Sequence, residues 1–155
     1  MIYIVEDDRN IQEIELFALK NSGYQAVGFE TAKDFYKALS EKLPELILLD
    51  IMMPDMNGYE VIERLKADER FCRIPVIFLS ALHDSENIVK GFKMGASDYV
   101  SKPFNHEELI TRVAHHMFIA EAQRVIVRQN EELQETLASR DKMYSVICLL
   151  YTSDA

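Results

Sequence analysis

The sequence has no tryptophan, only two cysteines, and few residues that break helices: five glycines and four prolines in 155 residues. The cysteines, Cys72 and Cys148, lie far apart and lack the spacing of metal ligands, which argues against a disulfide framework and a cysteine zinc site. Neither glycine nor proline occurs after Pro103, so nothing in the last third of the chain is expected to stop a helix. We expect reduced thiols, as in a cytoplasmic protein.

Positive charge is also scarce, because 17 Lys and Arg face 26 Asp and Glu, a formal net charge of -9. Without a basic stripe, this segment is not expected to bind nucleic acid. Acids follow the first apolar run within a few residues, which leaves no signal peptide, and the late apolar run 146–151 is too short to cross a bilayer. We therefore expect a soluble, cytoplasmic chain with no membrane partner through this segment.

What the chain does contain is an alternation of short apolar runs and amphipathic stretches. The central run is Leu46–Asp50, four apolar residues closed by an acid, which is typical of a strand buried on both faces. Further strands are predicted at 2–5, 24–29, 75–79 and 98–101. In the first helix the apolar pattern uses Ile11, Ile14, Leu16, Phe17 and Ala18, and Gly23 is predicted just after its end.

Polar residues mark the starts of the predicted helices. Asp8 is interpreted as the cap of the first helix, and Thr31 with Asp34 resembles a capping box. Asp84 or Ser85 can cap the fourth helix, and Asn105 opens the last. Five strands alternating with five helices predict an α/β fold, a doubly wound parallel sheet of order 2-1-3-4-5 with helices on both faces.

Charged and hydroxyl residues follow the predicted strands at one edge of this sheet. Glu6 and Asp7 end the first strand, Asp50 the third, Ser80 the fourth and Lys102 the fifth. In this strand order the first and third strands are neighbours at the switch point, where ligands bind. Three carboxylates in one crevice repel one another unless a cation neutralises them, and Mg²⁺ is the cation that prefers such oxygen ligands.

Four motifs in register carry a resemblance that covers residues 1 to about 118. They are IVEDD ending at Asp8, LLDIMMPDMNG at 48–58, FLSA at 78–81 and GASDYVSKPF at 95–104. Together they resemble the receiver domain of two-component response regulators, which implies a flavodoxin-like (βα)5 fold. The parent protein could be a sensor histidine kinase with an N-terminal receiver, or a regulator with another output.

The resemblance assigns a role to each residue of this edge. Asp50 would be the phosphoacceptor, taking a phosphoryl group from a sensor histidine kinase or a histidine phosphotransfer protein. Asp7 and Asp50 would bind Mg²⁺ through carboxylates, Glu6 through water and Met52 through its backbone carbonyl.

Three further residues would hold and report the phosphoryl group. Lys102, aimed by a cis bond to Pro103, and Ser80 would contact it. Tyr99 would be the switch aromatic, altering the surface of the fourth helix, fifth strand and fifth helix.

Each assignment has a simpler alternative. Asp50 could cap the turn after its strand, Ser80 could be only a small residue at a strand end, and Tyr99 could be an ordinary half-buried aromatic. His115 and His116 are interpreted as a solvated helix face, because adjacent helical positions point in different directions.

Function also has alternatives. Beyond Mg²⁺-dependent autophosphorylation and slow hydrolysis at Asp50, we expect no enzyme activity. The main alternative is a Mg²⁺-dependent phosphohydrolase with an aspartyl-phosphate intermediate. Such enzymes usually carry a second aspartate two positions after the nucleophile, where this chain has Met52. A structural dimerisation module with a silent pocket is the third class.

The region after the domain keeps a helical pattern. Val113, Met117, Ala120, Val127, Leu133 and Leu137 follow spacings near three and four, with charges on the other faces. We expect a receiver domain at 1–118 and a coiled-coil connector at 119–147 that forms a homodimer, or otherwise a lone amphipathic helix on its own domain. Residues 140–147 resemble the run before the histidine of sensor kinases, whereas 148–155 depart abruptly, and we expect a non-native or disordered tail there.

Overall fold

The computed structural model describes residues 1–54, 56–81 and 85–153, and among these the side-chain surroundings as far as residue 140, except those of Met56. Contacts divide the chain into two compact units, Met1–Ala120 and Glu121–Ala155. Five parallel strands form the sheet of the first unit: β1 (Ile2–Val5), β2 (Ala26–Phe29), β3 (Leu46–Asp50), β6 (Val76–Ser80) and β7 (Asp98–Ser101). Their order, β2-β1-β3-β6-β7, confirms the predicted doubly wound flavodoxin-like topology.

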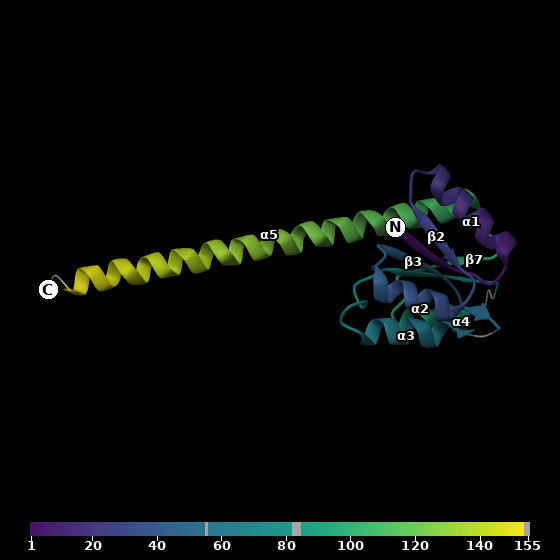
Figure 1. The fold of residues 1–155 in the computed structure, drawn as a ribbon, viewed down its shortest axis with the longest axis horizontal. Coiled ribbons are helices and arrows are strands. Elements are labelled where there is room, and N and C mark those ends of the chain that lie inside the picture. The colour runs from purple at the N-terminus through teal and green to yellow at the C-terminus, as the bar shows by residue number, and fades with distance from the viewer. Residues whose placement is uncertain (55, 82–84, 154–155) are drawn as a thin grey trace. The chain divides into compact units, whose positions relative to one another are not determined.

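Helices follow these strands along the chain. They are α1 (Arg9–Asn21), α2 (Ala32–Glu41), α3 (Gly58–Ala67), α4 (Ser85–Lys93) and α5 (His106–Ser153). Figure 1 shows α2, α3 and α4 together on one side of the sheet and α1 on the other, where the first turns of α5 also lie. Among the described residues, none of these helices combines the length and the apolar character that crossing a membrane requires.

The central strand explains why the sheet is covered on both faces. All five residues of β3 are buried. Ile47 and Leu49 pack into the cluster that contains α2 and α3, whereas Leu46 and Leu48 pack into the cluster that contains α1 and α5. Alternate residues of a strand point to opposite faces, so a continuous apolar run requires an apolar layer on each side.

Helix ends follow the predicted local signals. The Asp8 carboxylate accepts from the backbone N–H groups of Asn10 and Ile11, which confirms it as the cap of α1, and Thr31 Oγ1 accepts from Asp34 N. Gly23 follows α1 with φ 92°, a left-handed conformation that costs glycine little. The α4 helix begins at Ser85, and the alternative cap Asp84 lies outside the described residues.

Three findings depart from the sequence analysis. A two-stranded antiparallel sheet, β4 (Met52–Met53) with β5 (Met56–Asn57), was not predicted. The predicted apolar face of α1 was wrong in part, because Ile14 and Phe17 are exposed, while Gln12, Glu15, Ala18 and Leu19 are buried. The α5 helix also continues through Ser153, and Asp154 and Ala155 lie outside the described residues, so the predicted non-native tail at 148–155 stays a prediction.

Candidate functional site

The site lies at the carboxyl ends of neighbouring strands. Glu6 and Asp7 follow β1, Asp50 ends β3, and these two strands pair directly, from Ile2 with Leu46 to Val5 with Leu49. One oxygen from each of the three carboxylates lies within 4.8 Å of the others. Glu6 and Asp50 are buried, whereas Asp7 is exposed. The fold therefore brings together the three acids that the sequence analysis singled out.

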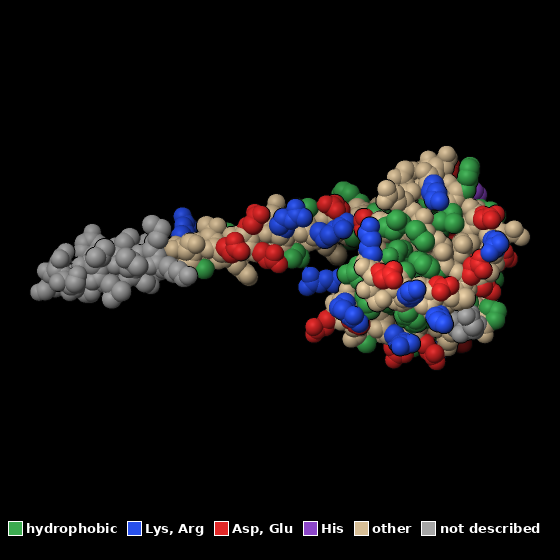
Figure 2. All heavy atoms as spheres, viewed as in Figure 1, with side chains coloured by type: hydrophobic (Ala, Val, Ile, Leu, Met, Phe, Trp, Pro, Cys, Tyr) green, Lys and Arg blue, Asp and Glu red, His purple; other side chains and the backbone are tan. Residues whose placement is uncertain are grey.

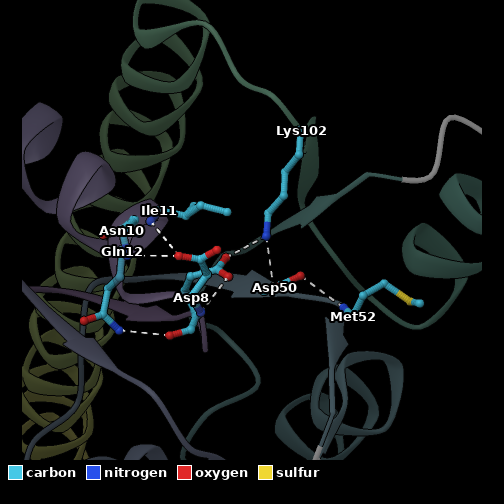
Figure 3. A network of polar contacts seen from close by, with 8 residues as sticks. Asp8, Asn10, Ile11, Gln12, Asp50, Met52 and Lys102 are labelled. Carbon is cyan, nitrogen blue, oxygen red and sulfur yellow. Dashed lines mark hydrogen bonds and ion pairs between the residues drawn. The ribbon is translucent and has the colours of Figure 1, made fainter.

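Lys102 supplies the positive charge of the site. It follows β7 at the edge of the sheet, and its bond to Pro103 is cis. Its ammonium nitrogen lies 2.7 Å from Glu6 Oε2 and 3.0 Å from Asp50 Oδ2. Figure 3 shows the Lys102 side chain extending from its strand end down to Asp50, with a dashed line marking their contact. Lys102 thus neutralises the two buried acids but makes no described ion pair with Asp7.

Asp50 is fixed through both of its oxygens. Oδ2 accepts from Lys102, while Oδ1 accepts from the backbone N–H of Met52 at 3.0 Å. The second bond is the contact that a residue capping this turn would make. Asp50 therefore both caps the turn and pairs with Lys102. An aspartate held in this way has one defined orientation, which matters for a weak nucleophile that depends on positioning.

Burial shapes the charges of the site. It raises the pKa of Glu6 to about 7, an effect that the Lys102 ammonium opposes and the Asp50 charge reinforces. Burial by itself would lower the pKa of Lys102, but its hydrogen bonds to Glu6 and Asp50 outweigh burial and hold that pKa above the ordinary value. A cation trapped between two acids stays charged.

Ser80 and Met52 lie beside the acids. Ser80 is buried at the end of β6, and its carbonyl oxygen accepts the Lys102 backbone N–H at 2.9 Å. This bond ties the base of the lysine to the neighbouring strand. Met52 contacts Asp50 through its amide, and its side chain is exposed. The predicted role of its carbonyl in holding a metal stays a prediction.

Tyr99 belongs to an aromatic group between β7 and α4. It pairs with Phe78 of β6 across the sheet, and the two rings stack at 5.7 Å between centroids. Phe92 of α4 meets the Tyr99 ring edge-on at 6.5 Å. Tyr99 is half-buried. The predicted switch residue therefore contacts the strand that ends in Ser80 and the helix that follows it.

A hollow beside the acids gives access to the site. It is lined by Asp7, Ile51, Met52, Met53, Pro54, Asn57, Tyr59 and Lys90. The Lys90 ammonium lies over the Tyr59 ring, 4.5 Å from its centroid, and Tyr59 donates to the carbonyl of Asn87. The exposed acid Asp7 thus faces an open space, which the buried acids do not.

Two residues near the site escaped the sequence analysis. Gln12 donates from Nε2 to the Glu6 carbonyl at 3.1 Å, and Glu15 is fully buried one turn further along α1. The spacing of Gln12, Glu15 and Leu19, at i, i+3 and i+7, is the signal that could have found this face. This face was missed because two of its three positions are polar, whereas Ile14 and Phe17 form a more apolar stripe.

The interpretation of the histidine pair as a solvated face was wrong for His116. Its Nε2 lies 3.1 Å from Asp98 Oδ2, and Arg112 donates to Asp98 Oδ1 at 2.8 Å. Burial alone would raise the pKa of Asp98, but Arg112, the Tyr99 amide and His116 together hold that pKa below its ordinary value. This network joins α5 to β7 one residue before Tyr99.

The donor set of the cluster fits a hard divalent cation. It offers carboxylate oxygens only, with no imidazole or thiolate, and one of the three acids is exposed to an open hollow. Mg²⁺ selects such oxygen ligands and keeps part of its water shell. Glu6, Asp7 and Asp50 are therefore the residues that could hold it.

Comparisons with known proteins cover the part of the chain that forms the sheet and its helices. The family model described as the response regulator receiver domain matches residues 2–114. The phosphate regulon transcriptional regulatory protein PhoB of Pseudomonas aeruginosa is 38% identical over 112 residues, which cover 72% of this chain and 49% of that protein. The DNA-binding dual master transcriptional regulator RpaA of Synechocystis is 41% identical over 115 residues, covering 72% of this chain and 46% of that protein.

Solved structures are similar over the same region. The signal receiver domain of a signal transduction histidine kinase from Syntrophus aciditrophicus is 33% identical, with a TM-score of 0.69, covering 75% of this chain and 88% of that chain. The receiver domain of the Francisella response regulator 1452 is 29% identical, with a TM-score of 0.70, covering 75% and 94%. The chain spans about half the length of the curated relatives it matches.

Proposed function

Because this chain belongs to the response regulator receiver domain family, we propose that it is a phosphoacceptor switch in a two-component phosphorelay. Its partner would be a sensor histidine kinase or a histidine phosphotransfer protein. The observation that carries the proposal is the contact of Lys102 with Asp50 at 3.0 Å, beside the carboxylates of Glu6 and Asp7. A nucleophile, a cation and a ligand set for a metal thus occupy one strand edge.

Asp50 is the nucleophile in this proposal. One carboxylate oxygen forms a bond to phosphorus while the bond from phosphorus to the phosphohistidine nitrogen breaks, and the histidine keeps that electron pair. The transferred group carries its negative charge on the equatorial oxygens. Lys102 already lies 3.0 Å from Asp50 Oδ2, so its ammonium is in place to balance that charge.

Mg²⁺ is the cofactor that the acid cluster suits. Asp7 and Asp50 would hold it through carboxylates, Glu6 through water and Met52 through its carbonyl. When bound, it neutralises charge on the acids and on the phosphoryl oxygens. Mg²⁺ would then contribute to neutralising Glu6 and Asp50, whose charge is balanced by Lys102 in this structure.

The output of the switch would pass through Ser80 and Tyr99. A phosphoryl group on Asp50 would draw the Ser80 hydroxyl, and Ser80 ends the strand on which Phe78 stacks against Tyr99. A turn of the Tyr99 ring would change its contact with Phe92 of α4. The surface of α4, β7 and α5 would then control an attached or partner output.

Phosphorylation by a small phosphodonor tests the proposal. We expect acetyl phosphate with Mg²⁺ to add one phosphoryl group, detected by intact mass, and Asp50→Asn to abolish the addition. Asp34→Asn is the matched control, because Asp34 is an exposed acid in α2. An undiminished mass shift in Asp50→Asn would refute the assignment of the phosphoacceptor.

The same sample addresses the enzymatic alternative. Met52 stands two positions after Asp50 and offers no acid or base, so we expect at most one turnover followed by slow hydrolysis. Rapid multiple turnover of a phosphate ester would instead favour the phosphohydrolase.

We also propose that the helix from Glu121 onward pairs with a second copy of the chain as a coiled coil. Ile126, Asn130, Leu133 and Leu137 follow a spacing of four, three and four, and the three apolar members are exposed. Figure 2 shows acidic and basic side chains interspersed along the described part of this helix, with hydrophobic ones between them. Asn130 would then be the polar core residue that fixes register.

Sedimentation measures this pairing. A concentration-dependent dimer is expected for the full chain, and a monomer for Leu133→Ser. Gln134→Ser is the control next to it in sequence. A monomer at all concentrations in the unmodified chain, with and without beryllofluoride, would count against the coiled coil.

A further inference from the structure

Glu15 is a fully buried acid that the proposed phosphotransfer does not use. It lies on the inner face of α1, in line with Gln12 and Leu19, and is 0% exposed. Leu19 belongs to the apolar cluster that also contains Leu109 and Val113 of α5. Within the described part of the chain, neither carboxyl oxygen of Glu15 has a hydrogen-bond partner.

An unpartnered carboxyl in such a place needs a compensating interaction. Burying a polar group without a hydrogen bond costs free energy, and an ionised carboxylate costs far more unless a cation pairs with it. Burial therefore raises the pKa of Glu15 to about 8, and the charges of Glu6 and Asp50 act in the same direction. Burial in this conformation therefore favours the neutral form of Glu15.

Lys102, which follows β7, is a cation close enough to Glu15 to act on its charge. Among the described residues, the groups that act on its charge are Glu6 after β1, Asp50 of β3 and Lys102 after β7, and only Lys102 favours the carboxylate. Lys102 is engaged elsewhere, at 2.7 Å from Glu6 and 3.0 Å from Asp50. A long lysine side chain can move its ammonium while its backbone stays fixed.

Both present partners of Lys102 belong to the acid cluster. Glu6 and Asp50 are two of the three acids proposed to hold Mg²⁺, so a divalent ion there and the Lys102 ammonium would compete for the same oxygens. Two cations on one pair of carboxylates repel each other. The ammonium then needs another anionic partner until a phosphoryl group arrives.

We propose that Glu15 is a positioning residue that accepts the Lys102 ammonium when a divalent ion occupies the acid cluster. The inference rests on the proposed Mg²⁺ site. On pairing, Glu15 gives its proton to solvent and becomes a carboxylate, while Lys102 keeps its charge. The Lys102 ammonium is thereby held in a buried position near Asp50 and does not turn out to solvent. A phosphoryl group on Asp50 then attracts the ammonium back to the site.

The test uses the full chain and Mg²⁺ alone as the probe. Glu15→Gln keeps the side-chain shape and removes the charge, and Glu13→Gln changes an exposed acid of the same helix. In the unmodified chain and in Glu13→Gln, NMR should show the Lys102 ammonium signal shifting with Mg²⁺ while its exchange with water stays slow. In Glu15→Gln we expect fast exchange once Mg²⁺ is added, and roughly 10-fold weaker Mg²⁺ binding by calorimetry, the scale of one charge-assisted hydrogen bond.

A second measurement needs no substitution. The side-chain carboxyl carbon of Glu15 should move to the position of an ionised acid when Mg²⁺ is added at pH 7, and return when beryllofluoride occupies Asp50. This keeps the inference testable if Glu15→Gln fails to fold. The inference would be overturned if the Glu15 signal did not change with Mg²⁺, or if Lys102 responded identically in Glu15→Gln and the unmodified chain. Glu15 would then be an acid that binds only a buried water.

The two levels of proposal fail in different ways. If Asp7→Asn binds Mg²⁺ as tightly as the unmodified chain, the acid cluster is not the metal site, and both proposals fall. If Asp7→Asn weakens binding but Lys102 and Glu15 do not respond to the ion, only the role of Glu15 is lost.

Discussion

The Lys102 ammonium donates to Glu6 Oε2 at 2.7 Å, joining two residues that lie 96 positions apart in the chain. Lys102 follows β7 at one edge of the sheet, and Glu6 follows β1, which is separated from β7 by β3 and β6. The side chain therefore crosses the ends of β6 and β3 to reach its partner, and it meets Asp50 on the way. One lysine thus links the strand ends that make the site.

Removing this lysine should destabilise the metal-free protein. Lys102→Met leaves Glu6 and Asp50 buried without a cation, and breaking a buried pair in this way costs about 3 kcal/mol or more. Urea unfolding at pH 7 should show this loss without Mg²⁺ and a smaller loss with it, because the ion replaces the missing charge. Lys33→Met, at an exposed position, is the control. Equal stability of Lys102→Met and the control without Mg²⁺ would contradict the described contacts.

Glu15 should make the free energy of unfolding fall as pH rises. Its pKa is raised from 4.5 to about 8, so between these values the folded state keeps a proton that the unfolded state has lost. The stability that Glu15 contributes is fully present below its pKa in the unfolded state. It falls by on the order of 1 kcal/mol per pH unit as pH rises toward its pKa in the folded state.

Glu15→Gln should remove that slope. Urea unfolding of both chains at several values from pH 5 to pH 8 measures it, with Glu13→Gln as the control. The slope due to Glu6 remains in all three proteins, since its pKa is raised as well. Parallel pH curves for Glu15→Gln and the unmodified chain would show that Glu15 is not a buried neutral acid.

Gly91→Ala should disturb the aromatic group around Tyr99. A Cβ at Gly91 would lie 2.5 Å from Phe78 Cε1, so the ring must shift. Overpacking of this kind costs about 1–3 kcal/mol, more than the roughly 1 kcal/mol that alanine gains over glycine in a helix.

A double-mutant cycle with Phe78→Leu checks that cause. In the Phe78→Leu background the ring is gone, and Gly91→Ala should become neutral or stabilising. The same loss of unfolding free energy in both backgrounds would mean that the Phe78 contact is not the cause.

Asp98→Asn should weaken the junction of β7 and α5. Asp98 accepts from Arg112 and contacts His116, and its side chain is 16% exposed. We expect a loss of about 1.5–3 kcal/mol at pH 7, because hydrogen bonds to charged groups contribute that much. Glu108→Gln removes an exposed partner of Arg112 and should cost 0.5 kcal/mol or less.

The effect of Asp98→Asn should also depend on pH. The folded pKa of Asp98 lies below its ordinary value of 3.8, so its contribution is present above pH 3.8 and is lost as pH falls through the folded pKa. The difference between Asp98→Asn and the unmodified chain should therefore not shrink from pH 7 to pH 5. A difference that vanishes already at pH 5 would contradict this.

Several features were predictable because their causes are local in sequence. The apolar run Leu46–Asp50 could only be buried on both faces, and Asp8 could cap α1 with its own side chain. The α1 face was less predictable, because Ile14 and Phe17 look more apolar than Gln12 and Glu15. Which stripe is buried depends on what Glu6 and α5 present to the helix, and α5 is distant in sequence.

The amino-acid sequence by itself determined the alternation of strands and helices and the placement of Glu6, Asp7, Asp50, Ser80 and Lys102 at strand ends, because periodicity and caps act over a few residues. Only the tertiary structure decided that Lys102 pairs with Glu6 and Asp50, that Asp7 stays exposed, that Glu15 is buried with no hydrogen-bond partner among the described residues, and that His116 meets Asp98. These outcomes depend on the competition of charges and packing between elements far apart in the chain, where a shift of a few ångströms changes which pair forms.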